Sequence, residues 1–558
     1  MSNRGGAAGP SRSGAPASAA PAPPRPEPVP VEFNASRNRL LRWLGLGRPD
    51  LLLLGGLFLV AFILRAFSPL MPDLLTGHTG GPPVSNCVHG TPVDASPRPG
   101  TLCGLSYPYQ RNSQAAGLPP SPPEGEIFDE IYFGVFAHND LKGIAYFDPE
   151  PPLAKEVIAG GELLDGWWLK TFGGREGDYA DLGFNPVGWR LASLVFGTLC
   201  VPLMYLLARQ LWRDRRFAFA ASFLTCFDGM FFVQSRIGMI DIIPIFLILL
   251  AYTLFALHLR SRSRRESYVT LVATGAVCGL AISAKWIALA ALASILFFLF
   301  IRGVASLLGR GSSAGEGRWR LGRLTLPYLP GRASTPSYVL LTVIAFFLLP
   351  LGIYLLSWLP FFTRGQFHSL GDLIAYQQQI YRYHATLTAT HPYGSNWYSW
   401  PFLYRPVAYY YEYRGLGVDE RSGQPLMAGI INLGNPFIWW PSLPALVLLP
   451  YYLLRDRSWA AAVILGGFIT QYLPWARVTR VLFLYHMFGG LIFMVLALAF
   501  VLTRLSRQPG RGWLLPAYLT VAGLGFVYFY PVWTGLPITY SAYFSGFPSG
   551  KMWFPSWI

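Results

Sequence analysis

The sequence predicts an all-α polytopic membrane protein, a bundle of about 11 transmembrane helices with long exterior loops. Three observations indicate this fold class. Of the 558 residues, 53% are hydrophobic. Only 13% are charged, whereas roughly 25% of the residues of a soluble domain carry charge. Apolar runs also recur along the chain at the length of about 20 residues that a helix needs to cross a bilayer.

The first 48 residues differ from the rest and are predicted to form a disordered cytoplasmic arm. Residues 1–31 are rich in Ala, Pro, Ser and Gly with scattered Arg, a composition too polar to form a core. The arm does not resemble a signal peptide, because the first apolar run begins only at Leu51 and no small-residue cleavage site follows it. Residues 49–558 are predicted to form one transmembrane domain.

Eleven apolar segments follow one another in that domain. They are Leu51–Phe67, Gly188–Leu211, Phe217–Val233, Ile242–Leu259, Tyr268–Ala284, Trp286–Ile301, Tyr338–Leu359, Pro441–Leu454, Ala460–Leu473, Leu482–Leu502 and Trp513–Tyr530. The eighth and ninth are short, so their ends are the least defined. Two long connections, residues 68–187 and 361–438, separate the spans on one side of the membrane.

Basic residues predict the orientation, because Lys and Arg accumulate on cytoplasmic loops. Arginine clusters precede span one and follow spans two, four, six, eight and ten, and all of them fall on one side when eleven spans alternate. That side is predicted to face the cytoplasm. The chain is thus expected to be a multi-pass protein of the cell (plasma) membrane, with a cytoplasmic N terminus and an exterior C terminus. Topology and anionic lipids thus explain the net charge of +16, without a nucleic-acid partner.

Charged residues also lie at the exterior ends of several spans, where they need another explanation. Charge within a membrane is costly, and basic residues on the exterior oppose the topology signal. The residues are Arg65, Arg190, Arg236, Asp241, Lys285 and Arg480. Together they predict a cationic site for an anion. A lipid phosphate is the best match, because the planar Arg fork suits phosphate oxygens.

An acidic pair, Asp129 and Glu130, lies in the first long connection within the stretch IFDEIYFG. Such a pair could simply solvate a surface helix, but beside a lipid phosphate a carboxylate can serve as general base. The base takes a proton from an acceptor hydroxyl, which attacks the anomeric carbon of a lipid-phosphate sugar while basic residues stabilise the leaving phosphate. A single displacement of this kind inverts the anomeric centre.

Cysteine and histidine spacing indicates no metal site. Cys200, Cys226 and Cys278 lie within spans, whereas Cys87 and Cys103 share the first long connection, where a disulfide and two free thiols both stay open. No His, Cys or Glu spacing is typical of metal ligands. We therefore predict no structural metal and no required cofactor, and a divalent cation beside the lipid phosphate stays open.

A series of short motifs makes the chain similar to a known family. In order they include Phe128-Asp129-Glu130, Pro151-Pro152-Leu153-Ala154-Lys155, Trp189-Arg190, Gln234-Ser235-Arg236 with Asp241, Lys285-Trp286, His391-Pro392-Tyr393, Trp397-Tyr398-Ser399-Trp400-Pro401, Arg480 with Tyr485-His486, and Pro555-Ser556-Trp557-Ile558. In this order and topology they resemble the protein O-mannosyltransferase family, membrane glycosyltransferases of the GT-C type. Its members transfer mannose from polyprenyl-phosphate-mannose to Ser or Thr of exported proteins.

The resemblance implies roles for particular residues. Asp129 is expected to be the catalytic base with Glu130 as its catalytic neighbour, and Arg65 and Arg190 match arginines near the donor phosphate. From charge and side of the membrane we extend phosphate binding to three further residues, Arg236, Lys285 and Arg480. The expected supporting residues are Asp241, Glu150, Lys155, His391, Trp400 and His486. The implied partners are the lipid donor, exported polypeptides and membrane lipids, and a protein translocon stays open.

Two departures from the family pattern matter. Glu150 stands before Pro151-Pro152 where the family usually has His. The role of this side chain is therefore open, and its negative charge would repel an anion near the cationic site. Residues 361–438 are too few for the β-trefoil MIR domain of eukaryotic members, and the stretch Tyr376 to Tyr383 is predicted to form an interfacial helix. The second departure indicates a bacterial-type member.

Two other functions stay open on the sequence. A GT-C transferase that acts on a lipid or cell-wall glycan shares the base and the cationic site but lacks a groove for an extended peptide. A transporter is less favoured, because transporters place charges near the bilayer midplane and often contain inverted repeats, neither of which is visible here. Mannose itself rests on the resemblance, since the charge pattern does not distinguish hexoses.

Overall fold

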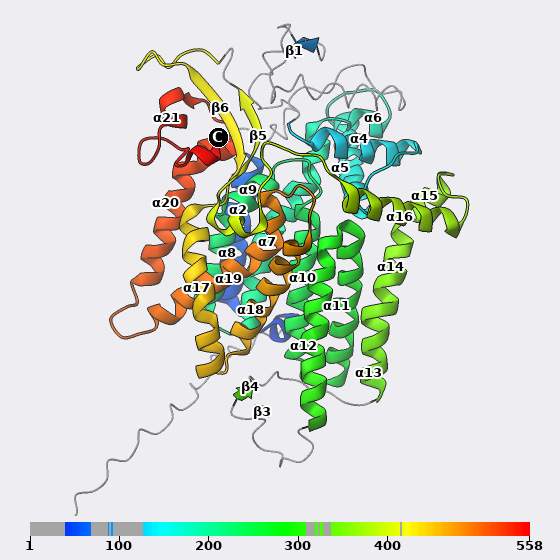
Figure 1. Ribbon diagram of the computed structural model, residues 1–558, viewed down its shortest axis with the longest axis vertical. Helices are drawn as coiled ribbons and strands as arrows, with labels where there is room; N and C mark the ends of the chain where they lie inside the picture. The colour runs from blue at the N-terminus through cyan, green and yellow to red at the C-terminus, as the bar shows by residue number, and fades with distance from the viewer. Residues whose placement is uncertain are drawn as a thin grey trace, which may run out of the picture. The chain divides into compact units, whose positions relative to one another are not determined.

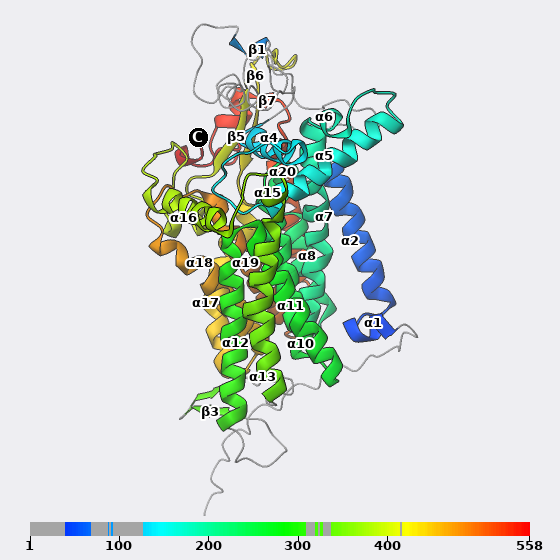
Figure 2. The same cartoon turned by 90° about the vertical axis from the view of Figure 1, so that its right-hand side faces the viewer.

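The computed structural model describes residues 39–67, 87–88, 91–92, 127–308, 319–321, 324–326, 336–412 and 416–558. Within these ranges, nine helices are long and apolar enough to cross a membrane. They are α2 (Arg48–Ala66), α7 (Pro186–Leu211), α10 (Ile242–Leu259), α11 (Arg264–Ala284), α12 (Leu289–Leu308), the run α13–α15 (Pro336–Thr363), α17 (Pro436–Arg455), α19 (Phe488–Ser506) and α20 (Leu514–Thr534). Figures 1 and 2 show them running alongside one another. Each corresponds to a predicted span.

The other two predicted spans are helical but shorter. Phe217–Val233 was predicted as one helix and is two, α8 (Arg215–Cys226) and α9 (Gly229–Gln234), while Ala460–Leu473 lies in α18 (Trp459–Tyr472). Asp228 causes the break, because its carboxylate accepts hydrogen bonds from the backbone N–H groups of Met230 and Phe231 and so caps α9. Both segments still pack within the bundle, α8 against α7 and α18 against α19.

The last residues of the arm that was predicted to be disordered form a helix. Residues 1–38 lie outside the described part, but Arg39–Leu44 form helix α1. Gln210 Nε2 donates to the carbonyl oxygen of Leu44 at 2.6 Å, and Arg209 Nη2 donates to that of Gly45 at 3.0 Å. These bonds fasten the chain before α2 to the end of α7, so the boundary of the folded unit lies before residue 48.

Burial separates the inner from the outer helices. Helix α10 packs against α7 and α11, and α19 packs against α17, α18 and α8. Most of α10 and α19 is buried, whereas α2 and the run α13–α15 expose many large apolar side chains. A helix that is apolar on every side is expected either in a core or against lipid, and this bundle has both kinds.

Short elements at one end of the bundle come from the two long connections. The first contains α4 (Glu130–Lys142), α5 (Leu153–Thr171) and α6 (Tyr179–Leu182), and the second contains α16 (Leu370–Thr386). The helix predicted around Tyr376 to Tyr383 is therefore confirmed. The short 3₁₀ turns are η2 (Trp286–Ala288), η5 (Trp397–Phe402), η6 (Leu473–Arg477), η7 (Leu484–Met487) and η8 (Pro555–Trp557).

A small sheet that the sequence did not predict joins the second connection to the C-terminal tail. Strands β5 (Val407–Glu412), β6 (Leu426–Asn432) and β7 (Ile538–Thr539) pair antiparallel in that order, and α21 (Tyr540–Phe544) follows β7. The minor pairs are β1 (Cys87–Val88) with β2 (Thr91–Pro92) and β3 (Trp319–Leu321) with β4 (Leu324–Leu326). Arg405 Nη1 also donates to the carbonyl oxygen of Ser556 at 2.9 Å, which ties down the last residues.

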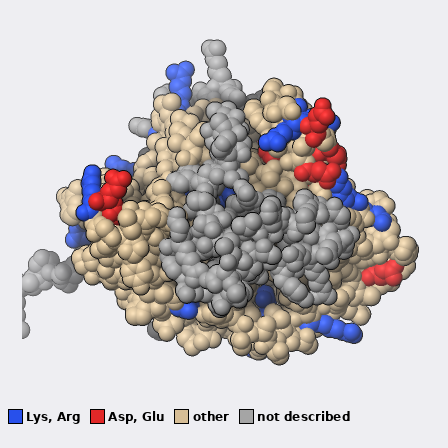
Figure 3. Space-filling model, turned by 90° about the horizontal axis from the view of Figure 1, so that it is seen from above, with Lys and Arg blue, Asp and Glu red and all other residues tan. Residues whose placement is uncertain are grey.

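On the described part of the surface that is visible from above (Figure 3), basic and acidic side chains lie beside one another at the left and at the upper right. Several charged side chains are instead buried within the fold, among them Arg65, Glu130 and Arg190. Buried charges need partners, and their partners locate the candidate site.

Candidate active site

Asp129 stands immediately before α4 with its side chain half-buried. The preceding Phe128 adopts φ 52°, in the left-handed region that costs a non-glycine residue about 1–2 kcal/mol. The Phe128 ring stacks on Tyr409 of β5 with the ring centroids 4.3 Å apart. This contact holds the strained turn in place and fixes the backbone position of Asp129. Such strain is typical of functional sites.

The pKa of Asp129 is raised to about 6. Burial is the largest cause, the nearby carboxylate of Asp241 raises the pKa further, and the ammonium of Lys285 lowers it. A carboxyl group with this pKa is mostly ionised at pH 7 and is still basic enough to accept a proton in a transition state. The group thus has the protonation chemistry of a general base.

Glu130, the other predicted catalytic acid, is fully buried and already bonded. Its carboxylate accepts from Arg190 twice, through Nε at 2.9 Å and through Nη2. It also accepts from the backbone N–H groups of Ile127 at 2.7 Å and Gly238 at 3.0 Å. These four bonds join the start of α4 to α7 and to the turn before α10. The geometry therefore favours a positioning role for Glu130 over contact with substrate.

Two glycines allow α4 and the turn before α10 to pack closely against Trp189 of α7. A Cβ on Gly134 of α4 would lie 2.3 Å from the ring of Trp189, and a Cβ on Gly238 would lie 2.9 Å from the Trp189 Cβ. Any side chain at either position forces the elements apart. The motif residues Gly134 and Trp189 are thus explained by close packing around the Glu130–Arg190 pair.

Lys285, between α11 and η2, is the cation whose charge lowers the pKa of the predicted base. Its Nζ donates to Asp241 Oδ1 at 2.8 Å and lies 3.7 Å from Glu150 Oε1. Burial lowers the pKa of Lys285, but the two carboxylates raise it, and the net shift is upward. Arg480, just after η6, is close enough to lower the same pKa. Asp129, Asp241, Glu150, Lys285 and Arg480 therefore share one site.

The remaining predicted phosphate-binding residues, Arg65, Arg190 and Arg236, are buried more deeply. Each is at most 1% exposed. Arg65 Nε donates to Ser235 Oγ at 2.8 Å, and Arg236 Nη1 donates to the Trp533 carbonyl oxygen at 3.4 Å. Arg65 Nη2 and Arg236 Nε and Nη2 are buried without a hydrogen-bond partner among the described residues. Burial thus divides the five predicted cations into two groups.

A polar cavity of about 420 Å³ lies beside Arg480. It is lined by residues 387–391, 394–397 and 478–482, and the N–H of Ser395 donates to the carbonyl oxygen of Leu482 at 2.8 Å across its walls. The volume falls within the roughly 300–1,000 Å³ of small-molecule sites. His391, a predicted supporting residue, belongs to the lining, and its Nδ1 accepts from the N–H of Tyr393 at 3.1 Å.

Trp400 and His486 pack against each other, and Trp400 is bonded to a residue that lines the cavity. Their rings stack with centroids 6.0 Å apart, and Trp475 packs edge-on against His486 at 4.5 Å. Trp400 Nε1 donates to Ser395 Oγ at 3.0 Å. Both predicted residues are buried, so they hold the walls of the cavity in place.

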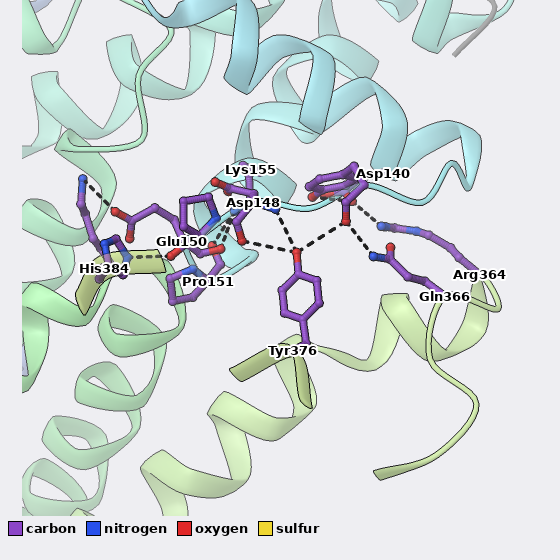
Figure 4. Close-up of polar contacts among 12 residues, drawn as sticks. Asp140, Asp148, Glu150, Pro151, Lys155, Arg364, Gln366, Tyr376 and His384 are labelled. Carbon is purple, nitrogen blue, oxygen red and sulfur yellow. Dashed lines mark hydrogen bonds and ion pairs between the residues drawn. The ribbon is translucent and has the colours of Figure 1, made fainter. Parts of the chain in front are cut away.

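Lys155, at the start of α5, fixes the segment that carries Glu150 (Figure 4). Its Nζ contacts the Asp148 carboxylate and donates to the carbonyl oxygens of Glu150 at 2.8 Å and Pro151 at 3.0 Å. The predicted supporting role of Lys155 is thus one of backbone positioning. Its ammonium is 1% exposed and does not contribute to the open part of the site.

Two neighbours of the site, Tyr409 and Tyr485, were not predicted as site residues, although Tyr485 belongs to one of the motifs of the resemblance. Tyr409 accepts hydrogen bonds from Gln234 Nε2 and Asn432 Nδ2, both at 2.8 Å. Tyr485 stacks on His486 with centroids 4.9 Å apart and is an electrostatic neighbour of Asp129. In a chain this rich in Tyr and Trp, an interfacial belt explains such residues equally well.

No three His, Cys, Asp or Glu side chains of the described residues lie together as metal ligands. Cys200, Cys226 and Cys278 are buried free thiols, and the side chains of Cys87 and Cys103 fall outside the described part. The site therefore offers a carboxylate of raised pKa next to Lys285 and Arg480. This combination can deprotonate a hydroxyl while binding an anionic leaving group.

Comparison with known proteins relates this site to a chemistry. The family model of dolichyl-phosphate-mannose-protein mannosyltransferase matches residues 122–363. The model of the C-terminal four-transmembrane region of protein O-mannosyltransferase matches residues 369–557. The polyprenol-phosphate-mannose–protein mannosyltransferase of Mycobacterium tuberculosis H37Rv is 24% identical over 490 residues, covering 77% of this chain and 86% of the relative. That of Corynebacterium glutamicum is 26% identical, covering 73% and 81%.

A solved structure shares the fold. The protein O-mannosyltransferase Pmt1–Pmt2 complex of Saccharomyces cerevisiae, bound to the sugar donor, matches with a TM-score of 0.63. The identity is 14%, and the match covers 89% of this chain and 92% of that one. At this identity the likeness concerns the fold alone. It confirms the predicted GT-C type of helical bundle.

Proposed function

This chain belongs to the protein O-mannosyltransferase family, and from that premise we propose that it transfers mannose from polyprenyl-phosphate-mannose to Ser and Thr hydroxyl groups of exported proteins. The observation that carries the proposal is the single site shared by Asp129, Lys285 and Arg480. A general base of raised pKa lies there beside two cations and a polar cavity.

The reaction is one displacement at the anomeric carbon. The ionised Asp129 carboxylate accepts the proton of the acceptor hydroxyl while the hydroxyl oxygen forms a bond to the anomeric carbon. The bond between that carbon and the phosphate oxygen breaks, and its electron pair leaves with the polyprenyl phosphate. Lys285 and Arg480 stabilise the developing negative charge, and attack from the face opposite the phosphate inverts the anomeric centre.

Other predicted residues serve the base and do not take part in the transfer. The Glu130–Arg190 pair fixes the start of α4, directly after Asp129. Asp241 holds the Lys285 ammonium in place, and Arg65 and Arg236 join the ends of neighbouring helices.

The proposed setting follows from the arginine distribution. The active site faces the exterior of a cell membrane, the N terminus is cytoplasmic and the C terminus is exterior. The catalytic unit is the transmembrane domain, which α1 extends toward the N terminus to residue 39, and the membrane lipids are its surroundings. An exported acceptor that is still unfolded exposes Ser and Thr in extended chain, so a protein translocon is a fitting neighbour.

The test is a transfer assay with the purified full-length chain in liposomes. Radiolabelled polyprenyl-phosphate-mannose is mixed with a Ser/Thr-rich peptide and, as a control, with the same peptide carrying Ala at every Ser and Thr. Label on the first peptide alone supports the proposal. Label that enters only a lipid or glycan fraction assigns the enzyme to another acceptor class and contradicts it.

A further inference from the structure

Glu150 is a charged group of the active site to which the reaction above gives no task. Its carboxylate lies 3.7 Å from Lys285 Nζ, while Asp241 accepts a direct hydrogen bond from the same nitrogen at 2.8 Å. The side chains of Lys285 and Glu150 are each 16% exposed. Lys285 thus has one tight carboxylate partner and one loose partner that solvent can reach. An incoming anion can displace the loose partner at the lower cost.

The backbone of Glu150 is fixed even though its carboxylate is loosely held (Figure 4). Lys155 Nζ donates to the carbonyl oxygens of Glu150 and Pro151, and His384 Nε2 lies 2.9 Å from that of Pro149. Two residues earlier, the N–H of Asp148 donates to the Tyr376 hydroxyl at 3.0 Å. Helix α16 and the start of α5 therefore hold the segment from both sides. Only the Glu150 side chain is left to move.

The charges around Lys285 come from several elements, and their balance depends on Glu150. The carboxylates are Asp129 before α4, Glu150 before α5 and Asp241 before α10, and the second cation is Arg480 after η6. The Glu130–Arg190 pair is neutral as a unit. The neighbouring Tyr354, Tyr409, Tyr485, His384 and His486 complete the surroundings. With all three carboxylates ionised, three negative groups face two positive ones, and Glu150 supplies the negative charge in excess.

We propose that Glu150 is a specificity-determining residue for the phosphate group of the lipid. It lies beside Lys285 and moves aside when the donor phosphate binds. After transfer it returns to Lys285 and so drives out the polyprenyl phosphate. The inference rests on the proposed function, since it assigns Glu150 a place in that reaction cycle.

The donor lipid and the product lipid differ in the charge of the phosphate group beside Glu150. The donor is a phosphodiester with one negative charge, whereas the product is a phosphomonoester that carries a charge of about −1.5 to −2 at neutral pH. Repulsion by a fixed carboxylate therefore acts more strongly on the product than on the donor. Glu150 lets the donor enter and shortens the residence of the product.

The experiment measures equilibrium binding of undecaprenyl phosphate to the purified full-length chain in detergent at pH 8. Removing one charge from a partly exposed ion pair is expected to change an equilibrium constant by about tenfold. Glu150→Gln is thus predicted to bind undecaprenyl phosphate about tenfold more tightly than the wild type. Glu150→Asp, which keeps the charge but reaches less far, is predicted to lie between them.

Glu176→Gln is the matched control, because Glu176 is an exposed carboxylate in the turn after α5 and its loss changes the net charge equally. Its affinity for undecaprenyl phosphate should equal that of the wild type. The gain of Glu150→Gln should shrink as salt rises, since ionic strength screens exposed charges. In the transfer reaction, Glu150→Gln should be inhibited more strongly by added undecaprenyl phosphate.

If Glu150→Gln does not fold, Glu150→His, which is neutral at pH 8, carries the same prediction. Affinity within twofold of the wild type in the folded variant, or weaker binding, overturns the inference. So does an equal gain in Glu176→Gln. The binding assay needs no transfer. Tighter binding without any mannosylation by the wild type therefore contradicts the proposed function and leaves the role of Glu150 intact.

Discussion

Arg190→Met tests whether Arg190 acts through Glu130 or on the lipid donor. The structure buries both side chains and joins them by two hydrogen bonds, with 1% and 0% exposure. The substitution leaves the Glu130 carboxylate with only the N–H groups of Ile127 and Gly238 as donors. Removing one partner of a buried ion pair costs about 3–5 kcal/mol, so the variant should be strongly destabilised.

The assay is thermal unfolding in detergent, followed by tryptophan fluorescence and paired with transfer kinetics. Arg190→Met should unfold at a clearly lower temperature than the wild type and should lose turnover, because the backbone at Asp129 is no longer held. Arg216→Met, at an exposed arginine of α8, is the matched control and should match the wild type. The double variant Glu130→Gln/Arg190→Met removes both charges and should regain about 1–3 kcal/mol relative to Arg190→Met.

One result refutes this reasoning. If Arg190→Met unfolds like the wild type and only its KM for the donor rises, then Arg190 contacts the lipid phosphate, as the sequence alone predicts. An additive double variant, with no recovery of stability, also contradicts the coupling between Arg190 and Glu130.

Three further outcomes follow from the same geometry. Lys285→Gln should lower kcat/KM for the donor by about tenfold to a hundredfold, the size of one charge-assisted hydrogen bond, and steady-state kinetics showing less than a twofold change would exclude phosphate contact. Because Asp129 must be ionised to accept a proton and its pKa is about 6, the transfer rate should rise with pH through about 6 and then level off. A rate that is flat between pH 5 and 8 rules out this base. Tyr409→Phe leaves the buried amides of Gln234 and Asn432 without their acceptor. The variant should lower the free energy of unfolding by about 1–3 kcal/mol. An unchanged denaturation midpoint would show that the hydroxyl is dispensable.

Most of the bundle could be predicted from the sequence, because membrane spans depend on the length and polarity of a run. The break at Asp228 could not, since its cause is a side chain that caps a buried helix start. The sheet of β5, β6 and β7 was also missed. It pairs residues more than one hundred positions apart, and two of its strands lie within an aromatic-rich connection.

The candidate site shows a similar limit. Topology placed Arg65, Arg190, Arg236, Lys285 and Arg480 at the same end of the bundle, but charge and side of the membrane do not indicate depth. Arg190 is buried and bonded to Glu130, whereas the side chain of Lys285 is 16% exposed. Only the structure distinguishes a cation that is paired within the protein from one that can meet a phosphate.

The central claim is that Asp129 takes the proton from the acceptor hydroxyl. The most direct measurement compares wild type and Asp129→Asn in two assays, binding of polyprenyl-phosphate-mannose and single-turnover transfer to a Ser/Thr peptide. Asn is nearly isosteric but cannot accept the proton, so the account predicts donor binding close to that of the wild type and no detectable transfer. Transfer by Asp129→Asn at a rate near that of the wild type would contradict the account.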